Sequence, residues 1–197
     1  SGEILYLWSA KNMEITGYVI DGHESVDSLR GDPPEDFHGH IIHHCTLIQT
    51  SGHYPSAPML WRNLHSGDPC YGPEDDYFHH NIVVCDGVRS PLTVMSWAPH
   101  IGSLIGITTL NCDYNLYFTN RSGGHILGLY NVGASFTDTA DNAAEFAAFW
   151  AAVGGNVTND LHSRVGDPLF VDAANGDYRP RSLLVLIDGE AVGALPL

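Results

Sequence analysis

Residues 42–48 read IHHCTLI, and residues 78–84, which begin 36 positions later, read FHHNIVV. Both stretches begin with an apolar residue and two histidines, and both continue through a small polar residue into a short β-prone run. A third copy, DYNLYF, occupies residues 113–118, and a fourth, ITGYVIDG, occupies residues 15–22. Each copy carries or precedes an Asp-Gly or Ser-Gly turn signal. Similar short strands at this spacing predict a solenoid whose coils stack in parallel.

The segments between these strands vary in length and composition. Residues 24–37 are acidic and contain proline, whereas residues 54–77 form a longer loop. One segment has the pattern of a helix, because Asp141 and Asn142 offer an N-cap and an alanine-rich run follows over residues 143–152. Its aromatic residues recur at the spacing of one helix face, so we interpret them as packing residues: Phe146, Phe149 and Trp150.

The composition and net charge of the chain argue against several classes of binding partner. Of 197 residues, 23 are Asp or Glu and 8 are Lys or Arg, which gives a formal net charge of −15. Phosphate backbones and anionic lipids repel such a chain, so neither nucleic acid nor a charged membrane surface is an expected partner. No apolar run approaches the roughly 20 residues of a membrane span. Hydrophobic residues make up 44% of the chain, which is enough for a folded core.

The C-terminal half carries a series of motifs in a fixed order. Residues 111–118 read NCDYNLYF, and the helical segment follows them. The later motifs are DLHS at residues 160–163, DPLFVD at 167–172, NGDYR at 175–179 and SLLVLIDG at 182–189. In this order they resemble the end of right-handed parallel β-helix repeat proteins of the pectate-lyase-like superfamily, although the last motif lacks the family's proline. The resemblance covers residues 108–190, and residues 12–107 share the general coil pattern.

The resemblance implies an all-β fold, a short right-handed parallel β-helix with one short α-helical insertion near residues 141–153. It implies a single β-helix domain over residues 1–197, with coils and long loops in 1–107 and C-terminal coils and a cap in 108–197. The group includes lyases, hydrolases, epimerases and non-catalytic surface proteins. Family members begin with a cap and further coils, whereas this chain opens on a coil-like strand. An acidic cap, a second subunit or processing would each account for this, so self-association through the N-terminal coil is one expectation.

The paired histidines suggest a catalytic face. Neighbouring strands of a parallel sheet lie about 4.8 Å apart, so we expect His44 to stack near His80, or His43 near His79. A polysaccharide lyase needs a base that removes the proton alpha to a uronate carboxylate, and a positive charge or dipole that stabilises the enolate. We therefore predict His44 or His80 as the base, with Arg62 or a bound Ca²⁺ as the neutralising charge. A polar ladder that only supports the fold is the alternative.

Other residues are candidates for binding sugar or metal. Aromatic residues near this region can stack on sugar rings, and the substrate-binding candidates are Trp61, Tyr77 and Trp97. His38 and His40 form a His-x-His pair that suits Zn²⁺ or Cu²⁺, and the alternative is hydrogen-bonded histidines without metal. Asp75 and Asp76 offer the hard oxygen ligands that Ca²⁺ prefers. As a cofactor, Ca²⁺ is favoured over Zn²⁺ or Cu²⁺.

Two further patterns involve reactive side chains. Asp160, His162 and Ser163 are the residue types of a catalytic triad, but three such residues within four positions rarely reach triad geometry. We interpret them as a turn in which Asp or Ser caps backbone groups. Among the four cysteines, Cys70 and Cys85 bracket a loop rich in Pro, Gly and Asp and are the favoured disulfide pair. Four buried free thiols are the alternative.

These features predict an exported protein, secreted or at the cell surface, that binds an acidic polysaccharide along the face formed by residues 38–118. They leave open whether it is an enzyme. A lyase acting by β-elimination is favoured over a glycoside hydrolase, which would use two carboxylates, for example from Asp75, Asp76 and Asp86. The scarcity of basic residues favours the alternative, a non-catalytic surface or assembly protein.

Overall fold

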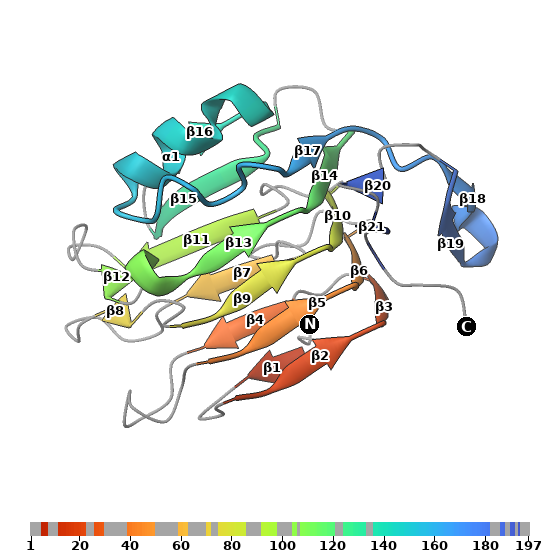
Figure 1. Cartoon of the computed structure of the whole chain (residues 1–197), viewed down its shortest axis with the longest axis horizontal. Coiled ribbons are helices and arrows are strands. Elements are labelled where there is room, and N and C mark those ends of the chain that lie inside the picture. Colours follow the sequence, from red (N-terminus) through yellow and green to blue (C-terminus); the bar gives the residue numbers. More distant parts are fainter. Residues whose placement is uncertain are drawn as a thin grey trace.

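The structure is a computed structural model in which strands dominate and one short helix lies against them (Figure 1). It describes residues 5–7, 12–22, 26–29, 39–49, 59–62, 70–71, 75–85, 92–97, 104–105, 107–120, 124–132, 136–181, 186–187, 190–191 and 193. No helix among these residues is long and apolar enough to cross a membrane.

Three larger sheets contain most of the strands. The four-stranded parallel sheet consists of β2 (Glu14–Thr16), β5 (Ile41–His43), β9 (Tyr77–His79) and β13 (Asn111–Asp113). The five-stranded parallel sheet consists of β3 (Val19–Gly22), β6 (Thr46–Gln49), β10 (Ile82–Cys85), β14 (Leu116–Thr119) and β17 (Arg164–Val165). The six-stranded sheet consists of β1 (Leu5–Leu7), β4 (Val26–Leu29), β7 (Met59–Arg62), β11 (Leu92–Trp97), β15 (Leu127–Val132) and β16 (Phe136–Ala140).

Smaller elements complete the described chain. The two-stranded sheets pair β8 (Cys70–Tyr71) with β12 (Leu104–Ile105), β18 (Phe170–Asp172) with β19 (Asp177–Pro180), and β20 (Leu186–Ile187) with β21 (Glu190–Ala191). The helical elements are the 3-10 turns η2 (Ile107–Thr109), η3 (Ala143–Glu145) and η4 (Ala173–Asn175) and the helix α1 (Phe146–Ala152).

The predicted fold class is wrong. In place of one short right-handed parallel β-helix, the described strands form several small sheets, and three of the pairings are antiparallel: β15 with β16, β18 with β19, and β20 with β21. The physical reason is the length of the connections. An antiparallel partner needs only a short reversal, such as residues 173–176 between β18 and β19, whereas a stacked coil needs a long crossover. A continuous solenoid is not found in the described chain.

The repeat alignment itself is confirmed by strand register. Ile42 pairs with Phe78, and Phe78 pairs with Cys112, which directly precedes the third copy, so apolar residues at equivalent positions lie in one row. Ile15 joins the same row through its pairing with Ile42. The copies therefore share one parallel register across the four- and five-stranded sheets, as the sequence spacing predicts.

A buried polar ladder holds the turn between these two sheets. The backbone N–H of Cys45 donates to Oδ1 of Asn81, at 3.0 Å, and the N–H of Asn81 donates to Oδ1 of Asn115, also at 3.0 Å. The N–H of Asn115 donates in turn to the Oγ of Ser163, at 2.9 Å. Amide Nδ2 groups of the two asparagines donate to the carbonyl oxygens of Ile42 and Phe78. Buried backbone groups at the turn are thus satisfied by side chains.

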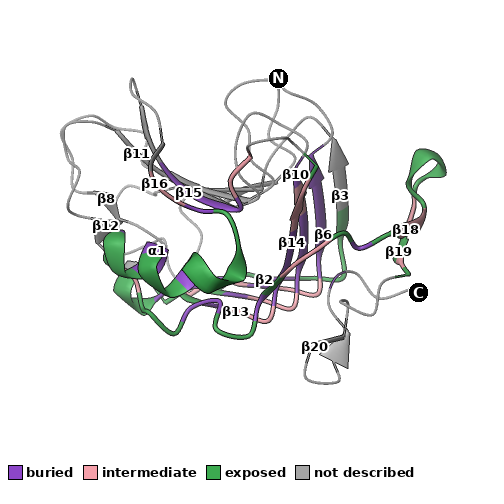
Figure 2. Cartoon of the chain, turned by 90° about the horizontal axis from the view of Figure 1, so that it is seen from above, coloured by how far each residue is buried: buried purple, intermediate pink, exposed green. Residues whose placement is uncertain are grey.

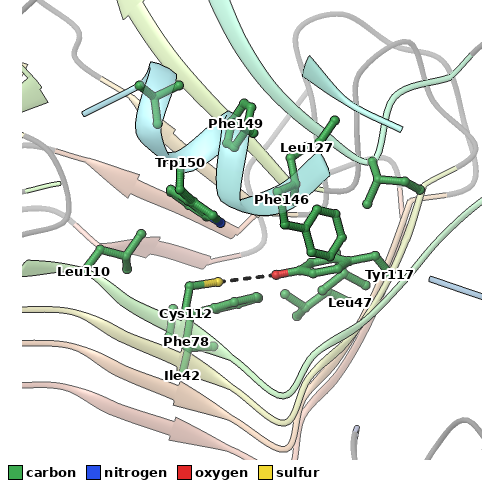
Figure 3. Close-up of a cluster of buried hydrophobic side chains, with 14 of the residues drawn as sticks. Ile42, Leu47, Phe78, Leu110, Cys112, Tyr117, Leu127, Phe146, Phe149 and Trp150 are labelled. Carbon is green, nitrogen blue, oxygen red and sulfur yellow. Dashed lines mark hydrogen bonds between the residues drawn. The ribbon is translucent and has the colours of Figure 1, made fainter. Parts of the chain in front are cut away.

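The core lies between the sheets and under α1 (Figures 2 and 3). Figure 2 shows buried residues on β6, β10 and β14 and along the strands that lead to them. Figure 3 shows Phe146 and Trp150 pointing from α1 toward Tyr117 and Cys112, whose Oη and Sγ lie 3.3 Å apart. The helix predicted over residues 143–152 is present, beginning with a 3-10 turn that Asn142 caps. Its predicted packing face is confirmed, since Phe146, Phe149 and Trp150 are buried.

The favoured disulfide between Cys70 and Cys85 is not formed. Cys85 is a buried thiol outside any disulfide, and its Sγ lies 3.5 Å from Oε1 of Gln49; Cys45 and Cys112 are likewise buried thiols outside disulfides. Cys85 belongs to the five-stranded sheet, whereas Cys70 belongs to the short strand β8, and its side chain lies outside the described residues. Bracketing a loop in sequence does not by itself give two cysteines the geometry of a disulfide.

Candidate active site at the turn between two sheets

The candidate site lies on the outside of the turn that joins the four-stranded sheet to the five-stranded sheet. At this turn His44, His80 and Tyr114 have positive φ angles of 52°, 55° and 57°. Gly17 occupies the same position in the N-terminal copy, residues 15–22, with φ of 74°. The left-handed conformation reverses the side-chain alternation, so the next residue points into the buried ladder while these rings lie outside it. In Figure 2 this turn is the corner where β13 leads to β14.

Four rings are stacked along the corner, and we call them the ring ladder: His44, His80, Tyr114 and His162. The ring centroids of His44 and His80 lie 5.2 Å apart with an interplanar angle of 8°. Those of His80 and Tyr114 lie 5.0 Å apart at 4°, and those of Tyr114 and His162 lie 4.7 Å apart at 6°. A second stack joins His43 to His79 at 5.1 Å. Both stacking alternatives expected from the sequence are therefore present.

Hydrogen bonds join the two stacks. The Nδ1 atoms of His43 and His44 lie 2.8 Å apart, and those of His79 and His80 lie 2.9 Å apart. Each such contact requires one nitrogen to donate and the other to accept, so at least one ring of each pair is neutral. Burial, together with the neighbouring imidazoles, lowers the pKa of His79 to about 4. His79 is thus neutral at neutral pH.

A cavity of about 380 Å³ opens beside the end of the ring ladder. It is lined by residues of β9 and β13, of the turns that directly follow these strands, and of the segment after α1: Tyr77, His79, His80, Asn111, Cys112, Asp113, Tyr114, Thr158, Asn159, Leu161 and His162. The Cys112 thiol is fully buried, and this burial raises its pKa well above the ordinary value. Cys112 is therefore held as a neutral thiol and is a poor nucleophile.

Asp113 and His162 form an oriented carboxylate–imidazole pair within this cavity. Nδ1 of His162 lies 2.7 Å from Oδ2 of Asp113. Oδ1 of Asp113 accepts from the backbone N–H of His162, at 2.7 Å, and from that of Tyr114, at 2.9 Å. With the carboxylate held at both oxygens, Nδ1 of His162 carries the proton and Nε2 is the basic nitrogen. This arrangement suits a general base.

Asp160 and Ser163 have structural roles, as the sequence predicts, although only Ser163 caps a backbone group, the N–H of Asn115. Asp160 is buried, and its carboxylate accepts hydrogen bonds from Ser163 Oγ at 2.6 Å, Tyr117 Oη at 2.9 Å and Trp150 Nε1 at 3.0 Å. Burial raises the pKa of Asp160 to about 6 despite these donors. His162, between them in sequence, points instead to Asp113, so the three residues do not form a triad.

Sequence reasoning missed His162 and Asp113 as site residues. The signal was an alignment one coil further along: Leu116 pairs with Arg164, so Tyr114 and His162 occupy equivalent positions before β14 and β17. Of the predicted catalytic residues, His44 and His80 both belong to the ring ladder, and His80 lines the cavity. Arg62 ends β7 in the six-stranded sheet, and its side chain lies outside the described residues.

The predicted substrate-binding residues are divided between sheets. Tyr77 lines the cavity and is 46% exposed. Trp61 belongs to β7 and Trp97 to β11, both in the six-stranded sheet, and their side chains lie outside the described residues. The structure therefore places one of the three candidates at the cavity.

The predicted metal ligands are only partly described. His38 lies outside the described residues. The backbone N–H of His40 donates to Oδ1 of Asp76, at 2.8 Å, and both residues are buried. Asp75 is exposed, and its backbone N–H donates to Thr109 Oγ1. Within the described ranges, no three His, Cys, Asp or Glu side chains are grouped so that they could hold a metal ion.

Comparison with protein-family models, with curated proteins and with solved structures finds no match to the chain. The resemblance to pectate-lyase-like proteins therefore has no support from these comparisons.

Proposed function

We propose that the protein binds an extended carbohydrate along the ring ladder and acts on it in the adjoining cavity, with His162 as the general base. The observation that carries the proposal is the Asp113–His162 pair in a cavity bounded by aromatic rings. An exported, extracellular location and an acidic polysaccharide as substrate belong to the same proposal.

The ring ladder supports carbohydrate as the ligand class. Its imidazole and phenol groups repeat at 4.7–5.2 Å along the corner, a spacing comparable to one sugar unit of an extended glycan. Imidazole nitrogens and a phenol hydroxyl both donate and accept hydrogen bonds, as sugar hydroxyls do. The exposed ring of Tyr77 at the cavity adds an apolar face on which a sugar ring can pack.

The geometry favours His162 over the bases predicted from sequence. Nδ1 of His44 and Nδ1 of His80 are each paired with a neighbouring imidazole. His162 is instead paired with a carboxylate, which fixes its tautomer and stabilises its protonated form during proton transfer. A base so placed serves β-elimination from a uronate, or it activates water for hydrolysis.

A panel of glycans tests the proposal. The wild-type protein is incubated with uronate polysaccharides and with neutral glycans, with and without Ca²⁺, while ultraviolet absorbance and new reducing ends are followed. Rising absorbance reports the unsaturated product of β-elimination, and reducing ends without absorbance report hydrolysis. If calorimetry detects binding but no glycan is cleaved, the protein is a carbohydrate-binding protein and His162 is not a general base. The absence of binding to every glycan overturns the proposal.

A second candidate function is self-assembly through the edge strands β2 and β3. These strands lie at the ends of their sheets, and Met13, Tyr18 and Val19 beside them are 44%, 60% and 47% exposed. Exposed apolar residues on a strand edge form a template for a second copy of the chain.

Assembly of this kind predicts a mass in solution above the 21.4 kDa of one chain, increasing with concentration. A lysine in place of Val19 puts a charge on the edge of β3 and is expected to weaken association at least tenfold, measured by sedimentation equilibrium. Leu169→Lys is the matched control, because Leu169 is 56% exposed but does not belong to an edge of these sheets. If the wild-type protein is a monomer at every concentration, self-assembly through β2 and β3 is excluded.

A further inference from the structure

A tyrosine lies directly against the proposed base. The rings of Tyr114 and His162 are stacked with centroids 4.7 Å apart and planes within 6° of parallel, and both residues line the cavity. On its other face the Tyr114 ring is stacked on His80, at 5.0 Å and 4°. The phenol ring is therefore held between two imidazoles.

The side chains of Tyr114 and His162 extend in the same direction from the backbone. One oxygen, Oδ1 of Asp113, accepts from the backbone N–H of both residues, at 2.9 and 2.7 Å, so the two side chains start next to each other. Their stacked rings show that they also end next to each other. Nδ1 of His162, the ring nitrogen nearer the backbone, faces Oδ2 of Asp113. The far edges of the two rings therefore place Nε2 of His162 beside the hydroxyl of Tyr114.

These two groups can act as a base and an acid. Nε2 of His162 is the basic nitrogen in the tautomer that Asp113 fixes. A phenol holds its proton at neutral pH and can donate it to an oxygen on which negative charge develops. β-Elimination needs both functions, because a base takes the hydrogen from C5 of a uronate while an acid protonates the glycosidic oxygen that leaves C4.

The stack places the acid and the base on one side of the substrate. Two side chains that run together present their far edges to the same face of a sugar ring, and neither reaches the opposite face. Elimination by this pair is therefore syn, which means that the hydrogen on C5 and the oxygen on C4 leave from the same face. In mannuronate and glucuronate units these two atoms share a face. In guluronate and galacturonate units they lie on opposite faces.

We infer that Tyr114 is the general acid of a syn elimination, and that the substrate is a 1,4-linked uronan in which the hydrogen on C5 and the oxygen on C4 share a face. The inference rests on the proposed function, since it names the substrate class and a second catalytic group of the same site.

The proposed step is balanced by these two residues. Nε2 of His162 takes the proton from C5, the electron pair of that C–H bond forms the C4–C5 double bond, and the C4–O bond breaks. Tyr114 gives its proton to the departing oxygen, which becomes the anomeric hydroxyl of the released sugar. The imidazolium of His162 then returns a proton to the phenolate of Tyr114, so both groups end in the state in which they began.

Two pairs of polymers test the substrate class with the unaltered protein. Polymannuronate and polyguluronate differ in configuration at C5, whereas β-1,4-polyglucuronate and polygalacturonate differ at C4 and at the anomeric carbon. Initial rates of the rise in ultraviolet absorbance are compared at equal uronate concentration. We expect the syn member, polymannuronate or polyglucuronate, to be cleaved at least tenfold faster than its partner in at least one pair. Tenfold corresponds to about 1.4 kcal/mol in the activation barrier.

The outcomes separate the inference from the proposed function. If polyguluronate or polygalacturonate is cleaved as fast as its partner, or faster, syn elimination is wrong, and a uronate lyase with His162 as the base remains. If absorbance stays flat with all four polymers while another glycan is bound or cleaved, the inference fails and carbohydrate binding stands. If no glycan is bound, both fail.

A variant tests Tyr114 as the acid. Tyr114→Phe keeps a ring for the stack but has no hydroxyl proton, so kcat on the preferred polymer is expected to fall about 10²–10⁴-fold with little change in KM. Tyr18→Phe is the matched control and should keep the wild-type kcat, because Tyr18 is 60% exposed and does not line the cavity. If Tyr114→Phe folds, shown by its circular dichroism, and keeps the wild-type kcat, Tyr114 is not the acid. If it does not fold, the paired polymers decide whether the elimination is syn.

Discussion

Glutamine in place of His162 is expected to lower the rate of glycan cleavage by about 10²–10⁴-fold, the usual contribution of a general base. Glutamine offers no basic nitrogen, so the proton-transfer step loses its acceptor. The backbone N–H of His162 still donates to Oδ1 of Asp113, so the local turn is kept. The measurement is the initial cleavage rate on the glycan that the wild-type protein cleaves, with binding followed separately by calorimetry.

A second His–Asp pair in the same chain provides the control. Nδ1 of His125 lies 2.5 Å from Oδ1 of Asp141, and neither residue lines the cavity. His125→Gln is therefore expected to leave the rate unchanged. Asp113→Asn is expected to lower the rate as well, because an amide NH₂ facing Nδ1 favours the tautomer with the proton on Nε2. A His162→Gln variant that cleaves at the wild-type rate removes His162 from the mechanism.

The sequence predicted strand pairing better than it predicted the fold class. Pairing between copies depends on the local repeat, so the alignment of residues 42–48 with 78–84 correctly placed Ile42 opposite Phe78 and His43 opposite His79. The helix was predictable for a similar reason, since its cap and apolar face lie within a dozen residues. The antiparallel pairings after β14 depend on short reversals, which a repeat of 34–36 residues does not encode.

Only part of the candidate site could be predicted from the sequence. The His-His pairs were visible as repeats, and the stacking of His44 on His80 follows from the register. The Asp113–His162 pair joins residues 49 positions apart, across the helix and its flanking turns. Such a contact depends on where the segment after α1 returns to the sheet. No local repeat or spacing in the sequence indicates that position.

Asp160 gives the protein a buried acid whose ionisation opposes folding. Burial raises its pKa from 3.8 to about 6, so between these pH values the folded chain holds a proton that the unfolded chain has lost. The contribution of Asp160 to the free energy of unfolding is therefore largest below pH 4 and falls as the pH rises through 6. The shift corresponds to about 3 kcal/mol.

His79 has the opposite effect over nearly the same range. Its pKa is lowered from 6.5 to about 4, so the unfolded chain takes up a proton first as the pH falls, and stability is lost on acidification. His79 is only half-buried, so solvent screening reduces its contribution below that of Asp160. Between pH 4 and 7 the effects of Asp160 and His79 on the free energy of unfolding partly cancel in the wild-type protein. The pH dependence of its stability therefore does not report either group by itself.

The difference between the wild-type protein and Asp160→Asn isolates the buried acid. Asparagine stays neutral, so the free energy of unfolding of the variant is expected to gain about 3 kcal/mol relative to wild type between pH 4 and 7. The measurement is urea unfolding at several pH values, followed by tryptophan fluorescence, because Trp150 Nε1 donates to Asp160. Asp167→Asn, which removes an exposed carboxylate, is the control for net charge. A constant difference between wild type and Asp160→Asn across this range would mean that Asp160 titrates alike in the folded and unfolded chains. The hydrogen bonds from Tyr117, Ser163 and Trp150 would then fully offset its burial.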